Sequence, residues 1–354
     1  MPMTGVLRPG HVALRVTDLE AAVKHYGQVL GLIETGRDAQ GRVYFKAWDE
    51  HDHHSVVLRK ADAPGMDYMG FRVDSEATLD SLAAAVEGSR LATDLQWIPA
   101  GEHLHTGRRF RFTVPTGHAI ELFASKDKVG NGLPDVNPDP WPDGLVGMQP
   151  TRFDHCLLYG DDVDGVVKLF TEVLGFTIAE QVMAGDVMVG VFLTCSTKPH
   201  DIAFIRNPEK GRFHHCSFIL DTWNDVLRAA DLISKHDVSL DIGPTRHGIT
   251  RGATIYFFDP SGNRNEVFAG GYIHYPDKPV ITWMVEDLGR AIFYHDRKLN
   301  EAFAKALASE EVKQKLQQQG TLALGGSPQQ YTRYIEEEYD RWGQVVKQAG
   351  VTQQ

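Results

Sequence analysis

Apolar and polar positions along the chain follow the same order of patterns twice. The run HVALRVTDLEAAVKHYGQVLGL, from His11, returns as HCLLYGDDVDGVVKLFTEVLGF, from His155. In each copy, alternating residues predict a short strand, and apolar residues at helical spacing predict an amphipathic helix that ends at Gly31 or Gly175. The two halves of the chain are therefore predicted to be copies of one design.

Two further pairs of segments extend this repeat. Residues 70–88 resemble residues 217–235, and residues 112–124 resemble residues 257–269, where each copy carries a Pro-x-Gly turn. Each half is thus predicted to hold two modules in which a single helix joins short strands. This order is typical of an α+β fold whose curved sheets surround a central space.

The segment between the halves, residues 125–150, is rich in Pro, Gly and Asp and is predicted to be a linker. We place the boundary near residue 147. The prediction is an N-terminal domain over residues 1–147, a C-terminal domain over residues 148–305 and a tail extension over residues 306–354.

A hairpin over residues 247–268 carries the most informative side chains. Its turn contains Pro260 and Gly262, which favour turn conformations. If Phe258 lies opposite Arg264, then Tyr256 lies opposite Glu266 on one face of the sheet. The first-half counterpart of Tyr256 is Arg111, which could neutralise Glu121 as an ion pair.

The repeat aligns three potential metal ligands of the second half with residues of the first: His155 with His11, His215 with Tyr68, and Glu266 with Glu121. Two imidazoles and one carboxylate are the donor set of the facial triad that holds non-haem Fe(II). Hydrogen-bonded core histidines are the alternative, because the spacing alone carries little specificity. Strand alternation predicts that Cys156, Cys216 and His214 face away from the ligands.

Composition narrows the possible partners. With 36 Lys and Arg against 47 Asp and Glu, the net charge is −11, which argues against nucleic acid or an anionic membrane as partner. No signal peptide or membrane span is predicted, so we expect a cytoplasmic protein. Three cysteines, an odd count in a long chain, predict reduced thiols.

Residues 5–305 resemble the extradiol catechol 2,3-dioxygenases, or metapyrocatechases, of the vicinal oxygen chelate superfamily. The resemblance is carried by long motifs, among them FDHCLLYGDD, STKPHDIAFI, PEKGRFHHCSFIL, DIGPTRHGIT, TIYFFDPSGNRNEVFAGG and LGRAIFYHDRKLN. It implies two glyoxalase-like domains, each of two βαβββ modules curved into an open barrel. Only the C-terminal barrel is expected to hold the metal.

The resemblance also implies roles for particular residues. It assigns His155, His215 and Glu266 as ligands to Fe(II), His200 as an acid/base residue near the dioxygen site, and His247 and Tyr256 as residues that flank the bound substrate. Ile249, Phe303 and Phe192 are candidates to enclose the aromatic ring, although each could equally pack in the core.

The implied reaction joins O₂ to catechol, or to alkyl- or chlorocatechols, and gives 2-hydroxymuconate semialdehyde in the meta-cleavage degradation of aromatic compounds. The alternative is a related extradiol dioxygenase for a larger catechol that uses Mn(II). A homotetramer is the family expectation.

The tail departs from that family. Residues 306–354 resemble the C-terminal helices of tripartite tricarboxylate-type solute receptors, with Ser327 and Pro328 predicted to begin an amphipathic helix. We interpret the tail as a fused remnant without a transport role.

Overall fold

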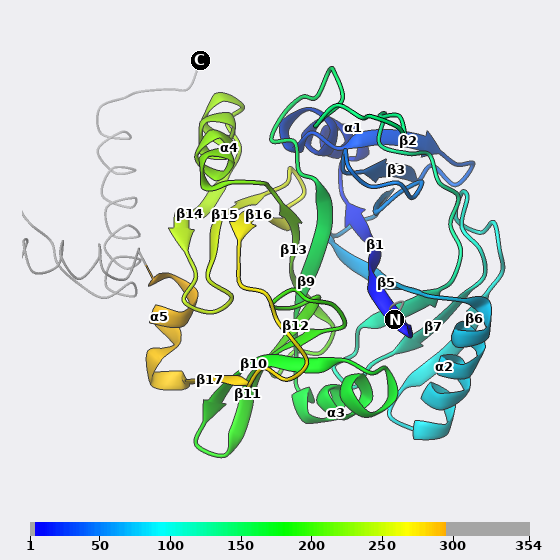
Figure 1. Ribbon diagram of the computed structural model, residues 1–354, viewed down its shortest axis with the longest axis vertical. Helices are drawn as coiled ribbons and strands as arrows, with labels where there is room; N and C mark the ends of the chain where they lie inside the picture. Colours follow the sequence, from blue (N-terminus) through cyan, green and yellow to red (C-terminus); the bar gives the residue numbers. More distant parts are fainter. Residues whose placement is uncertain (1–3, 295–354) are drawn as a thin grey trace, which may run out of the picture. The chain divides into compact units, whose positions relative to one another are not determined.

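The computed structural model describes residues 4–294, whose strands form two β-sheets (Figure 1). Phe303 and the predicted tail over residues 306–354 lie outside the described residues. The domain boundary near residue 147 stays a prediction.

The first sheet has eight strands in the order β2-β3-β4-β1-β5-β8-β7-β6. Its strands are β1 (Val6–Val16), β2 (Ile33–Arg37), β3 (Val43–Lys46), β4 (Val56–Lys60), β5 (Gly65–Val73), β6 (Thr93–Ile98), β7 (Arg109–Thr113) and β8 (Ala119–Phe123). Its helices are α1 (Leu19–Lys24), the π-helical turn η1 (His25–Leu30) and α2 (Glu76–Ser89).

The second sheet has nine strands in the order β14-β15-β16-β13-β9-β12-β11-β10-β17. They are β9 (Arg152–Gly160), β10 (Thr177–Ala184), β11 (Val187–Thr194), β12 (Ile202–Arg206), β13 (Arg212–Ile219), β14 (Leu240–Arg246), β15 (Gly252–Phe258), β16 (Arg264–Gly270) and β17 (Ile281–Met284). The helical elements are α3 (Val163–Lys168), η2 (Leu169–Val173), α4 (Trp223–Lys235), the 3₁₀ turn η3 (Val285–Asp287) and α5 (Leu288–Ile292).

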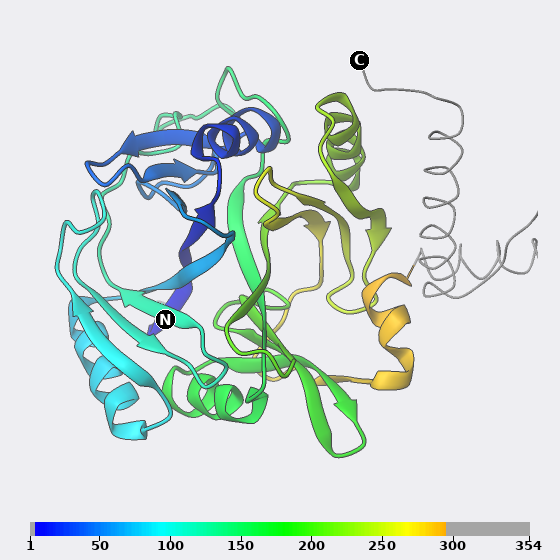
Figure 2. The ribbon, with the colours of Figure 1, turned by 180° about the vertical axis from the view of Figure 1, so that it is seen from behind.

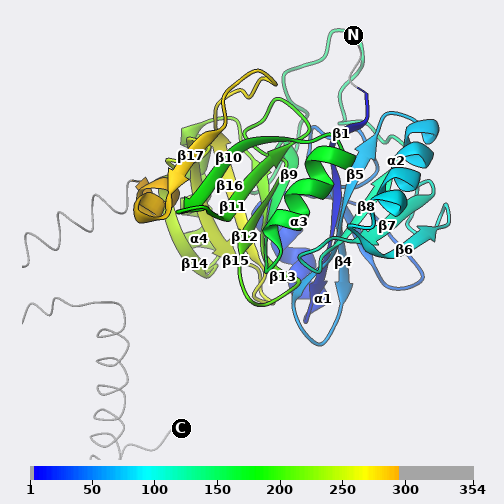
Figure 3. The ribbon, with the colours of Figure 1, turned by 90° about the horizontal axis from the view of Figure 1, so that it is seen from below.

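The strand orders confirm the internal repeat. Read from β10 to β14, the strand order of the second sheet matches that of the first sheet read from β2 to β6. The second sheet has one additional strand, β17, which pairs in parallel with β10. Each half contains two βαβββ modules, and each sheet keeps two edge strands in the described part of the chain, so neither closes into a full barrel. Figure 3 shows β17 and β6 at opposite ends of the row of strands.

Local sequence explains where the helices begin and end. The Asp18 carboxylate accepts the amide of Ala21, and Thr222 with Asp225 forms a capping box at the start of α4. Gly31 ends the first helical segment with φ of 88°, where an added Cβ would meet the Val146 carbonyl oxygen at 2.1 Å. Only glycine fits there.

The apolar faces of the helices and sheets merge into one main core. In the second half, α4 packs against β14, β15 and β16 through its buried face (Figure 2). The Phe71 ring of the first half meets Phe176 of the second edge to face, with centroids 5.4 Å apart. No helix within residues 4–294 is long and apolar enough to cross a membrane.

Candidate metal centre and substrate cavity

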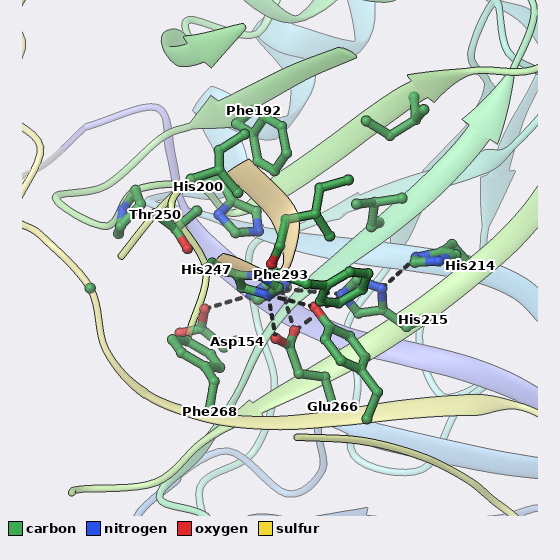
Figure 4. Close-up of a pocket in the computed structure, with 18 of the residues that line it drawn as sticks. Asp154, Phe192, His200, His214, His215, His247, Thr250, Glu266, Phe268 and Phe293 are labelled. Carbon is green, nitrogen blue, oxygen red and sulfur yellow. Dashed lines mark hydrogen bonds and ion pairs between the residues drawn. The ribbon is translucent and has the colours of Figure 1, made fainter. Parts of the chain in front are cut away.

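Three side chains from adjacent strands converge inside the second sheet. His155 on β9, His215 on β13 and Glu266 on β16 are all buried, and their potential ligand atoms lie within 4.8 Å of one another. Figure 4 shows His215 and Glu266 in the wall of a cavity. Glu266 Oε2 lies 3.1 Å from His155 Nε2 and 3.2 Å from His215 Nε2. The separation of the two Nε2 atoms is 3.5 Å.

The hairpin register predicted from sequence accounts for the position of Glu266. Phe258 pairs with Arg264, and Tyr256 therefore pairs with Glu266. Cys156 and Cys216 lie in the apolar core as free thiols, which confirms that they face away from the ligands.

Asp154 orients the first histidine. Its Oδ2 accepts a hydrogen bond from His155 Nδ1 at 2.9 Å, which directs Nε2 at the centre. Burial opposes ionisation of Asp154, but the ammonium group of Lys198, 3.2 Å away, and the imidazole of His155 hold the pKa of this carboxyl well below its usual range. Burial also disfavours the charged form of His155, yet hydrogen bonds to Asp154 and Glu266 outweigh it and raise its pKa.

His214 corrects a prediction from strand alternation. Strand alternation predicts that its side chain faces away from the site, but it lines the same cavity as His215. A bulge between Phe213 and His215 interrupts the pairing of β13 with β9, so the two-residue period fails there. The Nδ1 atoms of His214 and His215 are 2.7 Å apart, and Arg264 Nη1 lies 3.0 Å from His214 Nε2.

The other oxygen of Glu266 is held from the opposite side. Thr254 Oγ1 donates to Oε1 at 2.5 Å, and His247 Nε2 lies 3.4 Å from the same atom. Burial acts to raise the pKa of Glu266, but hydrogen bonds from His155 and His215 outweigh it and keep the pKa well below its usual range. The carboxylate is therefore charged at neutral pH.

The chemistry of these donors fits a divalent metal ion. Two imidazole nitrogens and one carboxylate oxygen lie around a common position. A metal ion bound by these three donors would keep open coordination positions, which is the arrangement that suits Fe(II). A buried carboxylate needs a compensating positive charge, which a cation between the three atoms would supply.

A cavity of about 320 Å³ opens beside these three residues. Five of the six residues proposed to act on or surround a substrate line it: His200, His247, Tyr256, Ile249 and Phe192. The sixth, Phe303, lies outside the described residues. The volume is in the range of small-molecule sites, and most of the lining is apolar.

His200 occupies the side of the cavity near Phe192. Its ring centroid lies 4.0 Å from that of His155 and 5.2 Å from that of Phe192. Burial, with the neighbouring His155, lowers the pKa of His200 well below its usual value, so the imidazole is neutral. Nδ1 of His200 is buried and has no hydrogen-bond partner among the described residues.

His247 and Tyr256 lie together in the wall of the same cavity. Tyr256 OH is 2.8 Å from His247 Nε2, and burial, with the charge of Glu266, raises the pKa of the phenol well above its usual value. Phe293 adds a ring whose centroid is 6.1 Å from that of His247.

Sequence reasoning missed several wall residues. Phe268, two positions after Glu266 on β16, could have been found from strand alternation, since its ring lies 5.4 Å from that of His155. Leu288, Ile292 and Phe293 come from the end of the described chain and carry no local signal for the cavity.

In the first half, Glu121 is the counterpart of Glu266, and arginine side chains surround it. Glu121 binds Arg111 at 2.5 Å and Arg109 at 3.0 Å, and His11 Nε2 lies 3.0 Å from the same carboxylate. The predicted pair of Arg111 and Glu121 is thus confirmed, and Tyr68 bonds to His103. In this half, cationic side chains compensate the buried acid.

Two family profiles match the chain. The Catechol 2,3-dioxygenase-like N-terminal domain matches residues 66–127. The Glyoxalase/Bleomycin resistance protein/Dioxygenase superfamily matches residues 152–267, the part that carries His155, His215 and Glu266.

Individual proteins extend this similarity over most of the chain. A metapyrocatechase of Pseudomonas sp. (strain CF600) is 59% identical over 305 residues, which is 86% of this chain and 99% of the relative. The manganese-dependent 2,3-dihydroxybiphenyl 1,2-dioxygenase of Geobacillus genomosp. 3 is 28% identical and covers 81% of this chain and 92% of its own length. The crystal structure of the 2,3-dioxygenase LapB from Pseudomonas sp. KL28 matches with a TM-score of 0.78 at 54% identity, covering 81% of this chain and all of LapB.

Proposed function

The chain belongs to the metapyrocatechases, a family of extradiol dioxygenases in the vicinal oxygen chelate superfamily, and from this premise we propose that it cleaves catechol with O₂. The product is 2-hydroxymuconate semialdehyde, and alkyl- and chlorocatechols are further substrates. The observation that carries the proposal is the convergence of His155, His215 and Glu266 in the wall of a cavity of about 320 Å³.

The proposed metal is Fe(II), held by these three residues. When bound, Fe(II) supplies Lewis-acid activation of the diol and an electron path between the diol and O₂. The two-imidazole, one-carboxylate donor set supports iron. Mn(II) is the second candidate, because a 28% identical relative is named for its dependence on manganese.

His247 and Tyr256 are proposed to bind the diol oxygens on one side of the site. The phenol donates to His247 Nε2 at 2.8 Å, so the lone pairs of the phenol oxygen remain to accept a hydrogen bond from an incoming hydroxyl group. Because only one side of the cavity carries this pair, the two oxygens of a symmetric diol become inequivalent, which favours cleavage outside the diol.

His200 is proposed to act as acid and base on the other side. It is neutral at pH 7, so it can accept a proton and later return it to an oxygen atom. Phe192 and Ile249, both buried, are proposed to pack against the aromatic ring. The apolar wall excludes water around that ring.

Anaerobic reconstitution with Fe(II), followed by catechol and then air, tests this function. The expected result is the yellow ring-fission product, and a His215→Ala variant is the matched control that should give none. Reconstitution with Mn(II), and the use of 2,3-dihydroxybiphenyl in place of catechol, distinguishes the two candidates. Absence of product from catechol with either metal would refute the proposal.

A homotetramer in the cytoplasm is the proposed physical state. Family resemblance supports the tetramer, and the net charge of −11 is consistent with a protein that binds neither nucleic acid nor an anionic membrane. Sedimentation equilibrium of the full chain tests the tetramer, and fractionation of the host cell tests the compartment.

A further inference from the structure

The loop that carries His247 is bound to the end of the described chain. We call residues 247–251 the substrate loop and residues 281–293 the closing segment. The amides of Gly248 and Ile249 donate to the carbonyl of Ala291 at 2.7 and 2.8 Å. His247 Nδ1 donates to the carbonyl of Ile292. These carbonyls lie at the C-terminal end of α5, where a helix cannot satisfy its own acceptors.

This contact fixes which nitrogen of His247 carries the proton. A backbone carbonyl only accepts hydrogen bonds, so Nδ1 must keep its hydrogen. In the neutral ring, Nε2 is then an acceptor, and it faces Tyr256 OH at 2.8 Å. The closing segment thereby sets both the plane and the tautomer of the imidazole that faces the cavity.

A buried carboxylate, that of Glu180, forms a second connection between the substrate loop and the closing segment. Glu180 on β10 is 1% exposed, and its Oε1 accepts the Thr250 amide at 2.6 Å. Its Oε2 accepts Trp283 Nε1 of the closing segment at 2.7 Å. Thr250 and Arg251 have φ of 57° and 63°, a region costly for residues other than glycine, so this loop shape needs outside support.

Gly248 makes the close approach possible. Its backbone is not in the left-handed region, so another residue could adopt its conformation. However, an added Cβ would meet the carbonyl oxygen of Arg290 at 2.7 Å, Ala291 Cα at 3.1 Å and Trp283 Cη2 at 3.1 Å. The constraint is space between the substrate loop and the closing segment.

We propose that the closing segment is a positioning element for His247, and that Gly248 is the residue that lets it dock. The same segment supplies Ile292 and Phe293 to the cavity wall. Docking of the closing segment therefore both encloses the diol and orients the imidazole of His247. This inference rests on the proposed function, because the diol is the ligand that His247 recognises.

Gly248→Ala in the full chain tests the inference, with Gly88→Ala as the matched control, since a Cβ at Gly88 meets nothing within 4 Å. Two quantities are measured: the anaerobic Kd for catechol of the metal-loaded protein, and hydrogen exchange of the peptide that contains Gly248 and Ile249. We expect Gly248→Ala to raise Kd about tenfold or more and to lose amide protection at an unchanged metal content. Gly88→Ala should match the wild type.

A wild-type Kd in Gly248→Ala that has lost this protection would overturn the proposal, because undocking the closing segment would then leave the binding of the diol unchanged. Retained protection together with a wild-type Kd would overturn it as well. If Gly248→Ala does not fold, Trp283→Phe replaces it: it removes the donor to Glu180 and should raise Kd in the same direction by a smaller factor. Wild-type protein that binds no catechol would refute the proposed function instead, while hydrogen exchange would still report whether the segments are docked.

Discussion

Asp154 Oδ2 lies 2.9 Å from Nδ1 of His155, and the other partners of this carboxylate within residues 4–294 are cationic. Its Oδ1 lies 3.2 Å from Lys198 Nζ and 3.0 Å from Arg152 Nη2. The acid is thus held ionised and in one orientation, and it fixes the histidine so that Nε2 points at Glu266. A ligand whose ring is fixed in advance loses little freedom when a metal binds.

Substitution of Asp154 by Asn is therefore expected to weaken metal binding about 10- to 100-fold while the protein stays folded. The amide lacks the charge that stabilises the Nδ1–H tautomer, and Lys198 loses a counter-charge. Competition with a chromophoric chelator measures the affinity directly, independently of turnover.

Asp201→Asn is the matched control for that prediction. Asp201 also binds Lys198, at 2.8 Å, but within residues 4–294 it forms no hydrogen bond or ion pair with the imidazole of His155. We expect this variant to lose stability and to keep wild-type metal affinity in the folded fraction. Equal losses of affinity in both variants would mean that Asp154 acts only through Lys198.

Metal stoichiometry should distinguish the two halves of the repeat. We expect about one ion per chain, because Arg109 and Arg111 already compensate Glu121 in the first half. His155→Gln should abolish binding, whereas His11→Gln, at the repeat counterpart, should leave the metal content of folded protein unchanged. Elemental analysis after gel filtration is the measurement, and a loss of metal in His11→Gln would contradict it.

Replacement of His200 by Asn should separate chemistry from metal binding. His200 contributes no atom to the three-residue centre, so metal content should be retained. Loss of a general acid typically costs about 10²- to 10⁴-fold, and we expect kcat to fall by that order.

His274→Asn provides the comparison for His200. His274 is a buried histidine of the same half that does not line the cavity, and its Nε2 is 3.1 Å from Thr177 Oγ1. Its kcat per bound metal should equal that of the wild type. Near-normal turnover in His200→Asn would remove His200 from the proposed mechanism.

Those parts of the structure that depend on local sequence could be predicted well. The repeated strand and helix patterns gave the order of modules, and the turn around Pro260 fixed the register that pairs Tyr256 with Glu266. The apolar core positions of Cys156 and Cys216 followed from the two-residue period.

Features that depend on irregular backbone or distant segments could not be predicted in the same way. His214 reaches the cavity because a bulge interrupts β13, and no residue in its neighbourhood signals that extra position. Ile292 and Phe293 line the cavity, although Ile292 lies 45 residues after His247, which it contacts. Lys198 binds Asp154 across a sequence separation of 44 residues, so no local pattern indicates this ion pair.

Acid should destabilise the protein through His118, which joins the two halves. Its Nε2 donates to the Arg212 carbonyl at 3.1 Å, and its Nδ1 lies 3.1 Å from Thr116 Oγ1. Burial lowers the pKa of His118 from 6.5 to about 4. As pH falls from 6.5 towards 4, the unfolded chain takes up a proton that the folded chain does not, so stability is lost in that window, at up to about 1.4 kcal/mol per pH unit.

His118→Gln tests this coupling, because glutamine can keep a donor and an acceptor but does not titrate. The fall in Tm between pH 7 and pH 5 should be smaller in this variant than in the wild type, as measured by circular dichroism on metal-free protein. His236→Gln, at an exposed position after α4, should show the full wild-type fall. An equal fall in His118→Gln and the wild type would show that another group controls stability in this pH range.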